Sequence, residues 1–210
     1  MMKKLTRLPK AAIAATALLA IAQGAAVFAN ADQGSAMGRQ ATGADWGPKW
    51  TADGKLKIPE GYHEWVFLGS PLTPNALNGG EAGFPEYHNV YVQPQAFHAY
   101  KKTGKWPEGT IMFKELQRVR SSMTADGSSV EVSGRGYFPG ALNGVDISVK
   151  DRTRFSDTND WGFFTFGHTA PPYSETAAEM PVEACASCHI ENATNMVFKK
   201  FYDPILESGQ

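Results

Sequence analysis

Cys185-Ala186-Ser187-Cys188-His189 is the stretch around which the chain is organised, and it contains the only two cysteines among the 210 residues. In a helical turn, a separation of three residues brings both sulfurs to one face. The spacing Cys-x-x-Cys-His is that of c-type haem attachment, where each thiol adds across one haem vinyl group. The histidine after the second cysteine then lies under the iron as its proximal axial ligand. The motif therefore predicts one covalently attached haem c, with Cys185 and Cys188 as attachment points and His189 as the metal ligand.

Three other interpretations of the two cysteines are weaker. A structural zinc site usually has four Cys or His ligands, and the chain has no further cysteine to complete one. A thioredoxin-like redox pair is expected beside a βαβ pattern, which is not apparent near this end of the chain. A structural disulfide would explain the two thiols but would leave the adjoining His189 without a role.

The N-terminus predicts export. Residues 1–10 are basic, residues 11–28 are apolar and rich in alanine, and Ala29-Asn30-Ala31 offers small residues at the two positions that a signal peptidase reads. An uncleaved membrane anchor is the alternative, but Gln23 and Gly24 interrupt the stretch just before the cleavage site. Because c-type haem is attached outside the bacterial cytoplasm, we expect a periplasmic protein.

The domain organisation follows from the signal peptide, residues 1–31. Its removal leaves 179 residues, a length typical of one domain, and lowers the formal net charge from −1 to −5. Residues 32–49 are rich in Gly, Ala and small polar residues and predict a flexible leader. Residues 50–210 are expected to form a single domain. The modest acidic excess argues against nucleic acid and against an anionic membrane as partners.

The pattern of the domain indicates an α+β fold that is predominantly β. Pro94–Thr103 predicts a helix closed by Gly104, and the Gly- and Pro-rich segment 69–85 predicts a long loop that could cover a cofactor. The C-terminal part, residues 175–206, is expected to be helical around the haem motif. Strands are expected at residues 62–68, 87–92, 110–120, 130–138, 145–150 and 161–166, with a turn at residues 140–144. This order suggests an antiparallel sheet with flanking helices, the last of which carries the attachment motif.

The sixth position of the iron decides whether such a protein carries electrons or binds small molecules. The methionines after the signal peptide do not stand in the Pro-rich loop context of small electron-carrier cytochromes, so we expect the position to be open. Met196 follows the haem motif closely and is expected to pack on the proximal side. These methionines are Met37, Met112, Met123, Met180 and Met196.

Two polar residues on predicted strands are candidates for the other side of the haem. His88 shares a strand face with Val90 and Val92, so it could hydrogen-bond a ligand on the iron, although a histidine satisfied within the core or at an edge would have the same pattern. Lys114 shares a face with Met112 and Leu116; it is either a snorkelling lysine or a nucleophilic amine beside the haem.

The other histidines have no distinguishing neighbours and are expected at the surface. They are His63, His98 and His168.

Taken together, ordered matches along almost the whole mature chain give it a resemblance to a known family. They are Glu64-Trp65-Val66, Thr73-Pro74-Asn75, Leu77-Asn78, Val90-Tyr91-Val92, Lys101-Lys102-Thr103-Gly104, Lys114-Glu115-Leu116, Gly136-Tyr137-Phe138, Ser148-Val149-Lys150-Asp151, Asn159-Asp160-Trp161, Cys185–Ala193 and Met196-Val197-Phe198. From about Trp50 to Leu206 the chain resembles the P-460 cytochromes, c-type haem proteins of ammonia- and methane-oxidising bacteria that oxidise hydroxylamine.

The resemblance implies a β-rich homodimer with an open distal haem site. It implies that Lys114 is bonded through its side-chain nitrogen to a meso carbon of the haem, which would leave no ammonium to bury. It further implies oxidation of hydroxylamine to nitrous oxide or nitric oxide, with electrons leaving to a soluble cytochrome c. One member of the family has an arginine at the position of His88. His88 is therefore our candidate catalytic residue, and we expect the hydrogen bonds on the distal side of the haem to differ from those of that member.

Two points stay open at this stage. The proton acceptor could be Glu175, Glu179 or Glu183. The runner-up function is that of a β-sheet cytochrome c-prime, which binds nitric oxide or carbon monoxide under a phenylalanine-lined cap, and an electron-transfer cytochrome is the third. Residues that could form such a cap are Phe84, Phe113, Phe163 and Phe164.

Overall fold

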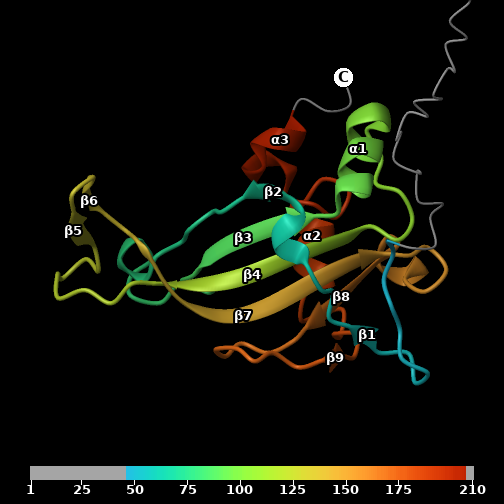
Figure 1. Ribbon diagram of the computed structural model, residues 1–210, viewed down its shortest axis with the longest axis horizontal. Helices are drawn as coiled ribbons and strands as arrows, with labels where there is room; N and C mark the ends of the chain where they lie inside the picture. The colour runs from blue at the N-terminus through green and yellow to red at the C-terminus, as the bar shows by residue number, and fades with distance from the viewer. Residues whose placement is uncertain (1–45, 207–210) are drawn as a thin grey trace, which may run out of the picture. The chain divides into compact units, whose positions relative to one another are not determined.

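The computed structural model describes residues 46–206 and shows a five-stranded antiparallel sheet in the order β2-β3-β4-β7-β8 (Figure 1). The predicted signal peptide and residues 32–45 of the predicted leader lie outside the described residues. Residues 46–49 pack against the domain: the Trp46 carbonyl accepts a hydrogen bond from Gln93 Nε2 at 3.1 Å, and the Lys49 carbonyl accepts one from the Lys57 amide at 2.8 Å.

The strands and helices follow one another in a simple order. The strands are β1 Leu56–Lys57, β2 Val66–Gly69, β3 Tyr87–Val92, β4 Ile111–Val119, β5 Ser129–Glu131, β6 Gly134–Gly136, β7 Pro139–Lys150, β8 Trp161–Thr165 and β9 Thr176–Ala177. The α-helices are α1 Pro94–Thr103, α2 Ala186–Asn192 and α3 Asp203–Leu206. Short 3-10 helices cover Tyr62–Glu64, Asn75–Leu77, Ser156–Thr158 and Lys199–Phe201. This arrangement confirms the predicted α+β class, with antiparallel strands dominant and the Cys-x-x-Cys-His motif on a C-terminal helix.

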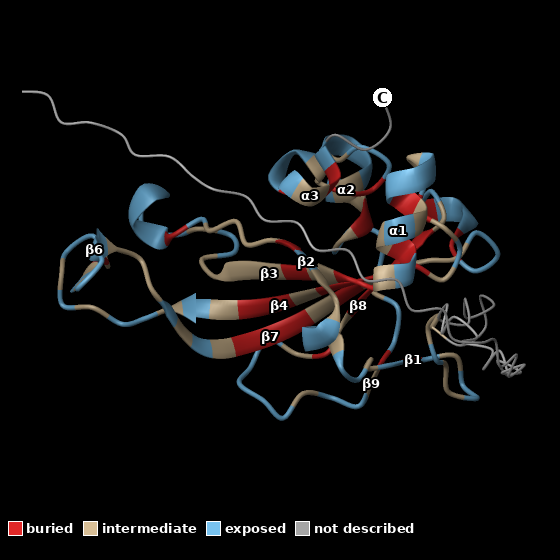
Figure 2. Cartoon of the chain, turned by 45° about the horizontal axis from the view of Figure 1, so that its top comes forward, coloured by how far each residue is buried: buried red, intermediate tan, exposed pale blue. Residues whose placement is uncertain are grey.

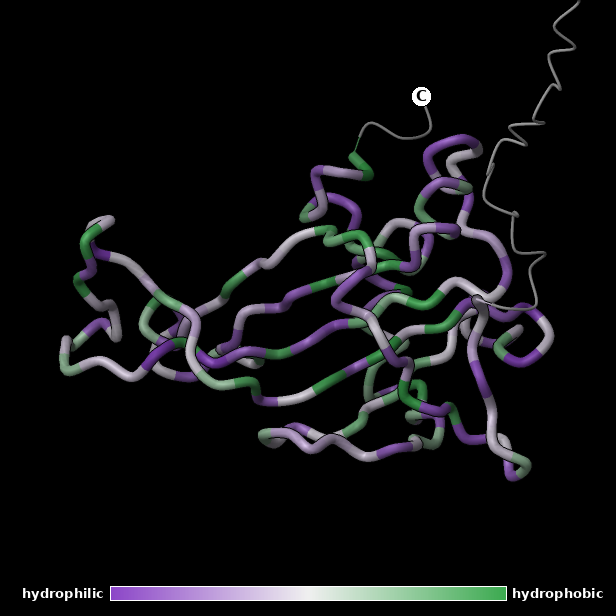
Figure 3. Tube along the Cα trace, in the orientation of Figure 1, coloured by the Kyte–Doolittle hydropathy of each residue, from purple (hydrophilic) through white to green (hydrophobic). Residues whose placement is uncertain are grey.

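The α-helices lie on one side of the sheet, while β1 and β9 lie on the other (Figure 2). We call the side that the helices cover the helical face. The strand register places Val90 beside Lys114, Lys114 beside Asp146, and Ser148 beside Phe163 on this face. Because strand residues alternate between faces, their sequence neighbours point to the other side. Apolar and polar residues alternate from Val145 to Lys150 of β7, whereas β4 begins with three apolar residues, Ile111-Met112-Phe113 (Figure 3).

Each face carries its own hydrophobic core. On the helical face the buried core residues are Leu68, Val90, Val92, Ala96, Tyr100, Trp106, Met112, Trp161, Phe163, Ala186, Met196, Val197, Tyr202 and Ile205. On the opposite face they are Leu56, Ile111, Phe113, Val145, Ile147, Val149, Phe155, Phe164, Phe166 and Ala177. Apolar burial on both sides fixes the strand register, because a slip of one residue would move every side chain to the wrong core.

Helix α1 and strand β3 have the predicted bounds, because residues within each element or directly beside it specify them. Helix α1 begins at Pro94, whose fixed φ suits the first helical position, and ends before Gly104, which has a left-handed φ of 68°. Strand β3 covers Tyr87–Val92, as its Tyr- and Val-rich composition predicts. Strands β4 and β8 differ from the predicted ranges only at their ends.

The strand predicted over residues 62–68 is wrong in its first half. Tyr62–Glu64 forms a 3-10 turn after Gly61, and strand β2 begins at Val66. Tyr62 turns toward the sheet, where its ring stacks on Phe113 with centroids 3.7 Å apart and its hydroxyl donates a hydrogen bond to Glu115. A contact with another strand thus outweighs the local β propensity of this stretch.

The predicted strand at 130–138 and the predicted turn at 140–144 are also wrong. Residues 129–136 form the small β5–β6 hairpin, and β7 runs without interruption from Pro139 to Lys150. Gly140 and Gly144 lie inside β7, at positions where neighbouring backbone atoms leave no room for a side chain. A Cβ on Gly144 would lie 2.7 Å from the Gly167 carbonyl oxygen, and one on Gly140 would lie 3.1 Å from the Arg118 carbonyl oxygen. The glycines mark close approach of backbone, not a turn.

The C-terminal part is much less helical than predicted. Only α2, α3 and the turn Lys199–Phe201 are helical between residues 175 and 206, and Thr176–Ala177 pairs with β1. Asn195 and Met196 adopt left-handed φ values of 51° and 66°, which reverse the chain directly after α2. No helix among residues 46–206 is long and apolar enough to cross a membrane.

Gly162 offers a test of how tightly β8 is packed. A Cβ at this position would lie 2.4 Å from the ring of Phe155, which is 3% exposed. Gly162→Ala should therefore lower the free energy of unfolding by about 1–3 kcal/mol through overpacking. Urea denaturation measures the change, with Gly83→Ala as the control because no atom lies within 4 Å of its Cβ position. Equal stability of the two variants would contradict the packing described for β8.

Candidate haem site

Helix α2 presents the attachment motif. Cys185 is the N-cap residue and Cys188 lies within the helix; both are free thiols, the first half-buried and the second exposed. Nδ1 of His189 lies 2.8 Å from the carbonyl oxygen of Met196. Because a carbonyl can only accept, Nδ1 carries the hydrogen, and Nε2 keeps its lone pair for a metal. Such a hydrogen bond fixes the tautomer and orientation of a metal-binding histidine.

The aromatic surroundings of His189 hold its ring in place. The centroid of the ring lies 4.5 Å from that of Phe163 on β8 and 4.8 Å from that of Phe198. Met196, which was expected near the proximal side, supplies the carbonyl that His189 contacts and is 4% exposed. Its left-handed φ turns that carbonyl back toward the helix.

The other interpretations of the cysteines find no support in the fold. The two thiols are not joined to each other. In residues 46–206 no three His, Cys, Asp or Glu side chains gather into a group that could hold a metal ion. The main sheet is antiparallel throughout, so α2 does not follow a βαβ unit of the thioredoxin type.

Lys114 lies in the middle of the helical face, where it forms an ion pair. Its Nζ is 2.9 Å from Oδ2 of Asp146 on the neighbouring strand and 4.8 Å from the ring centroid of Phe84. The side chains of Lys114 and Asp146 are 26% and 22% exposed. Lys114 is thus held at the face by a carboxylate and an aromatic ring, and the simple snorkelling interpretation does not describe it.

Asp146 is the main site residue that the sequence reasoning missed. Burial alone would raise the pKa of Asp146, but the charge of Lys114 and hydrogen bonds from Lys114 and His168 outweigh burial, and its pKa is lowered. The sequence could have indicated Asp146, because in the predicted strand 145–150 it stands between Val145 and Ile147, which both face the opposite core. An acidic residue at an inward position of a strand was a signal of the same kind as Lys114.

His88 lies on the helical face with Val90, as its strand pattern predicted. Its Nε2 is buried and, within the described part of the chain, has no hydrogen-bond partner. The Phe84 ring stands edge-on to it, with centroids 5.6 Å apart. Burial first, and then the charge of Lys114, lower the pKa of His88 to about 4, so the ring is neutral at pH 7. A buried polar atom of this kind calls for a partner such as a bound ligand.

Lys114 acts electrostatically on three of the other four residues predicted for the site. The charge of Lys114 is felt by His88, His189 and Cys185. The pKa of the Cys185 thiol is raised mainly by burial and then by the charge of Asp146. The motif on α2 and the polar residues of β3, β4 and β7 therefore belong to one site.

The remaining histidines are exposed, as expected, but His168 has a partner that the sequence did not indicate. His168 has a distinguishing neighbour: its Nε2 lies 2.9 Å from Oδ1 of Asp146, and its side chain is 49% exposed. His63 is 66% exposed, with Nε2 3.7 Å from Glu115 Oε1, and His98 is exposed on α1. The sequence did not indicate the role of His168 because its partner lies 22 residues away.

The four phenylalanines proposed as a cap do not lie together. Phe113 and Phe164 belong to the core of the opposite face, and Phe163 contacts the proximal His189. Phe84 alone, from the long loop between β2 and β3, lies beside Lys114 and His88. The loop reaches the site, as expected for a segment that covers a cofactor.

The glutamates suggested as proton acceptors have other surroundings. Glu179 pairs with Phe164 through an isolated bridge; burial raises its pKa, and the charge of Arg154 opposes this. Arg154 stacks on Trp50 at the opposite face, 3.9 Å from the ring centroid. Asp146, in contrast, contacts Lys114 directly and is the better placed carboxylate.

These residues fit a c-type haem. Two unpaired thiols stand beside a histidine whose Nε2 is free for iron, and a buried imidazole nitrogen on the sheet lacks a partner. Haem binding needs this combination of attachment points, axial ligand and apolar walls. The walls are supplied by the core of the helical face.

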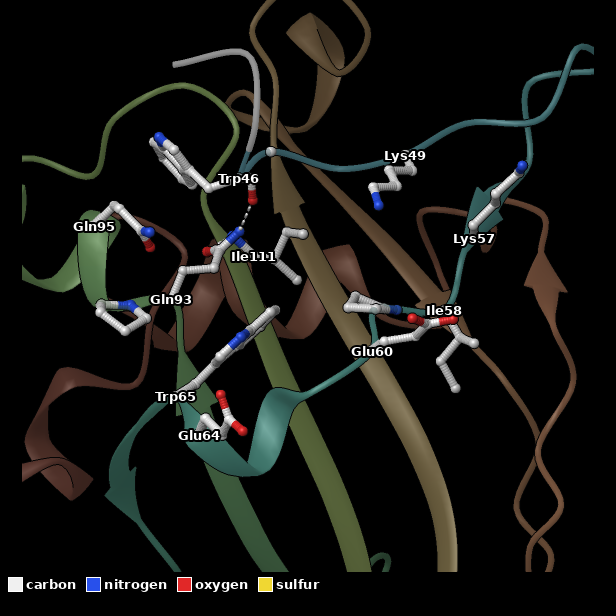
Figure 4. A pocket seen from close by; sticks show the side chains of 13 residues that line it. Trp46, Lys49, Lys57, Ile58, Glu60, Glu64, Trp65, Gln93, Gln95 and Ile111 are labelled. Carbon is white, nitrogen blue, oxygen red and sulfur yellow. Dashed lines mark hydrogen bonds between the residues drawn. The ribbon is translucent and has the colours of Figure 1, made fainter. Parts of the chain in front are cut away.

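A cavity of about 680 Å³ elsewhere in the domain has different chemistry (Figure 4). Trp46, Trp65 and Gln93 line it together with charged side chains of the 49–64 segment. Gln93 uses its amide fully, donating to the carbonyls of Trp46 and Gly109 and accepting from the Ile111 amide. The lining contains no cysteine or histidine, so this cavity is separate from the haem site.

The comparisons with known proteins agree with the site. The family model described as Cytochrome P460 matches residues 59–199, about two thirds of the chain. No curated protein matches the chain. The family match covers the Cys-x-x-Cys-His motif as well as His88, Lys114 and Asp146.

The buried His88 predicts a pH dependence of stability. With a pKa of about 4 in the folded chain and 6.5 when unfolded, His88 binds fewer protons in the folded state between these values. Stability should therefore be complete above pH 6.5 and fall as the pH drops towards 4. His88→Gln should reduce this loss by about 3 kcal/mol at pH 4, measured by urea denaturation across the range. His98→Gln, at an exposed site, should keep the wild-type slope; identical slopes in both variants would contradict the burial of a neutral His88.

Proposed function

The chain belongs to the cytochrome P460 family and is a haem cytochrome, and from this premise we propose that it is a periplasmic c-type haem oxidoreductase acting on hydroxylamine. The proposed products are nitrous oxide, nitric oxide or both. The observation that carries the proposal is the contact of Lys114 with Asp146, on the sheet face against which the attachment helix packs. It joins an amine able to bond the haem to a carboxylate able to accept a proton.

The attachment residues have defined roles in this proposal. In the haem-loaded protein, Cys185 and Cys188 would hold the haem through thioethers to its two vinyl groups, and Nε2 of His189 would be its iron ligand. The hydrogen bond from His189 Nδ1 to the Met196 carbonyl holds the imidazole in the tautomer that the metal requires. Free thiols and a correctly oriented imidazole on one short helix support this assignment.

We assign Lys114 as a third covalent link to the haem. As a free ammonium on a partly apolar face it requires the partnership of Asp146, whereas an amine bonded to the macrocycle carries no charge to bury. Phe84 and Asp146 hold the nitrogen near the middle of the face. Strand β4, through Lys114, and helix α2, through its cysteines, would then each hold the haem covalently.

When bound, the haem supplies the iron that binds hydroxylamine and takes up its electrons. Asp146 is positioned to accept a proton that the substrate loses, because it is a half-buried carboxylate beside Lys114. Once Lys114 is bonded and neutral, the main cause of the lowered Asp146 pKa is removed, and burial favours proton uptake. His88 is neutral, and its buried Nε2, which has no hydrogen-bond partner among residues 46–206, offers a hydrogen bond to a ligand at the haem.

Electrons then leave to an external acceptor, for which we propose a soluble cytochrome c. The exposed positions of Cys188 and Ile190 on α2 support this, because they bring the haem attachment point close to the protein surface. We propose a homodimer on the strength of the family resemblance. The periplasmic location rests on the N-terminal signal pattern.

The link at Lys114 is tested by proteolysis and mass spectrometry. We expect one haem to remain bound to two peptides, one with Cys185 and Cys188 and one with Lys114, and the ferrous Soret band to be strongly red-shifted. Lys114→Ala should release the second peptide and give the spectrum of an ordinary five-coordinate c haem. Lys150→Ala, which removes another lysine paired with an aspartate on this sheet, should leave the link intact.

Two results would overturn parts of this assignment. An ordinary c-type spectrum in the wild type, with haem held by the thioethers alone, rejects the third link. A six-coordinate spectrum would instead support an electron-transfer cytochrome.

The role of Asp146 is tested by Asp146→Asn, which keeps the shape of the side chain but cannot accept a proton. Hydroxylamine oxidation should slow by about 100-fold or more, because a positioned base contributes on that scale. Steady-state kinetics with an artificial electron acceptor measures the effect, and the haem content should be unchanged. A wild-type rate in Asp146→Asn would exclude it as the proton acceptor.

A further inference from the structure

The two oxygens of Asp146 contact different surroundings. Oδ2 lies 2.9 Å from Lys114 Nζ on the helical face, and Oδ1 lies 2.9 Å from His168 Nε2. The His168 side chain is 49% exposed, whereas that of Asp146 is 22% exposed. One carboxylate thus connects the haem site to a ring that reaches solvent.

We propose that His168 is a proton carrier that moves protons from Asp146 to the solvent. The proposal deepens the proposed function and depends on it only in so far as Asp146 receives a proton from a ligand at the haem. The proton transfer needs no reactant other than water. Protonated Asp146 gives its proton from Oδ1 to Nε2 of the His168 tautomer that holds hydrogen on Nδ1. The imidazolium then loses the Nδ1 hydrogen to water, and the exposed ring regains its tautomer by exchange with solvent.

The position of His168 is built into the sheet. The Gly167 carbonyl accepts a hydrogen bond from the Val145 amide at 3.1 Å, which holds the segment after β8 against β7. Gly144 permits this approach: a Cβ there would lie 3.0 Å from the His168 Cα and 2.7 Å from the Gly167 oxygen. The missing side chain at residue 144 therefore allows His168 to reach the neighbouring Asp146.

The other charged or titratable groups around Asp146 are poorly suited to carry the proton out. Lys114 and Cys185 are consumed by bonds to the haem in the proposed function. His88 is buried, and its pKa of about 4 keeps it neutral. His168 combines a hydrogen bond to Asp146 with contact to solvent, and each of its two ring nitrogens can carry a proton.

Cyanide binding tests the relay without turnover. Hydrogen cyanide loses its proton when it binds ferric haem as the anion, so haem absorbance reports ligand binding and an indicator dye in weakly buffered solution reports proton release. In the wild type the two signals should coincide in stopped-flow mixing. In His168→Gln, Asp146 still accepts the proton, so the absorbance change should keep its rate while the dye response lags by about 100-fold.

Matched variants complete the experiment. His98→Gln, at an exposed histidine on α1, should behave as the wild type. Gly144→Ala should reproduce the lag by displacing His168, whereas Gly140→Ala, in the same strand, should not. If His168→Gln does not yield haem-loaded protein, Gly144→Ala tests the proton relay in its place.

The failure of the relay can be told apart from failure of the proposed function. Coincident signals in His168→Gln, or in Gly144→Ala when that variant decides, overturn the relay whatever the protein does with hydroxylamine. A lag in His168→Gln supports the relay even if hydroxylamine is not oxidised, because cyanide and not the substrate delivers the proton.

Discussion

The ion pair between Lys114 and Asp146 is the interaction on which the site depends. A lysine on a half-buried sheet face carries a desolvation cost that a carboxylate at 2.9 Å offsets. Pairing across β4 and β7 in antiparallel register brings the two residues opposite each other, although they are 32 positions apart in the chain. The same register sets His88 and Phe163 on this face, the first beside the proposed ligand position and the second against the proximal His189.

The two sides of the sheet have separate tasks. The opposite face is filled by aromatic and aliphatic residues such as Phe113 and Phe164, and it provides a rigid support. The helical face combines an apolar core with a small set of polar groups, which suits a largely apolar cofactor that has a reactive metal centre. Since strand residues alternate, Lys114 on β4 is flanked by Phe113 and Glu115, which are buried on the opposite face.

Backbone conformation decides how the C-terminal segment serves the site. Helix α2 has only seven residues, and the left-handed Asn195 and Met196 turn the chain back so that a main-chain carbonyl meets His189. Met196 thus contributes its backbone oxygen, a role that no pattern of side chains reveals. Gly144 acts in a similar way: its missing side chain admits the segment that places His168 beside Asp146.

The sequence by itself determined the Cys-x-x-Cys-His motif, which residues of β3 and β4 share the helical face, helix α1 and the predominance of antiparallel strands. These follow from short-range spacing, since a two-residue or three-residue period depends only on neighbouring residues. The tertiary structure alone decided that Asp146 pairs with Lys114, that His168 joins them, and that residues 140–144 continue a strand. It also separated the four phenylalanines onto different faces. Those outcomes depend on which strands lie side by side and on backbone contacts between distant segments, and spacing along the chain carries no information about either.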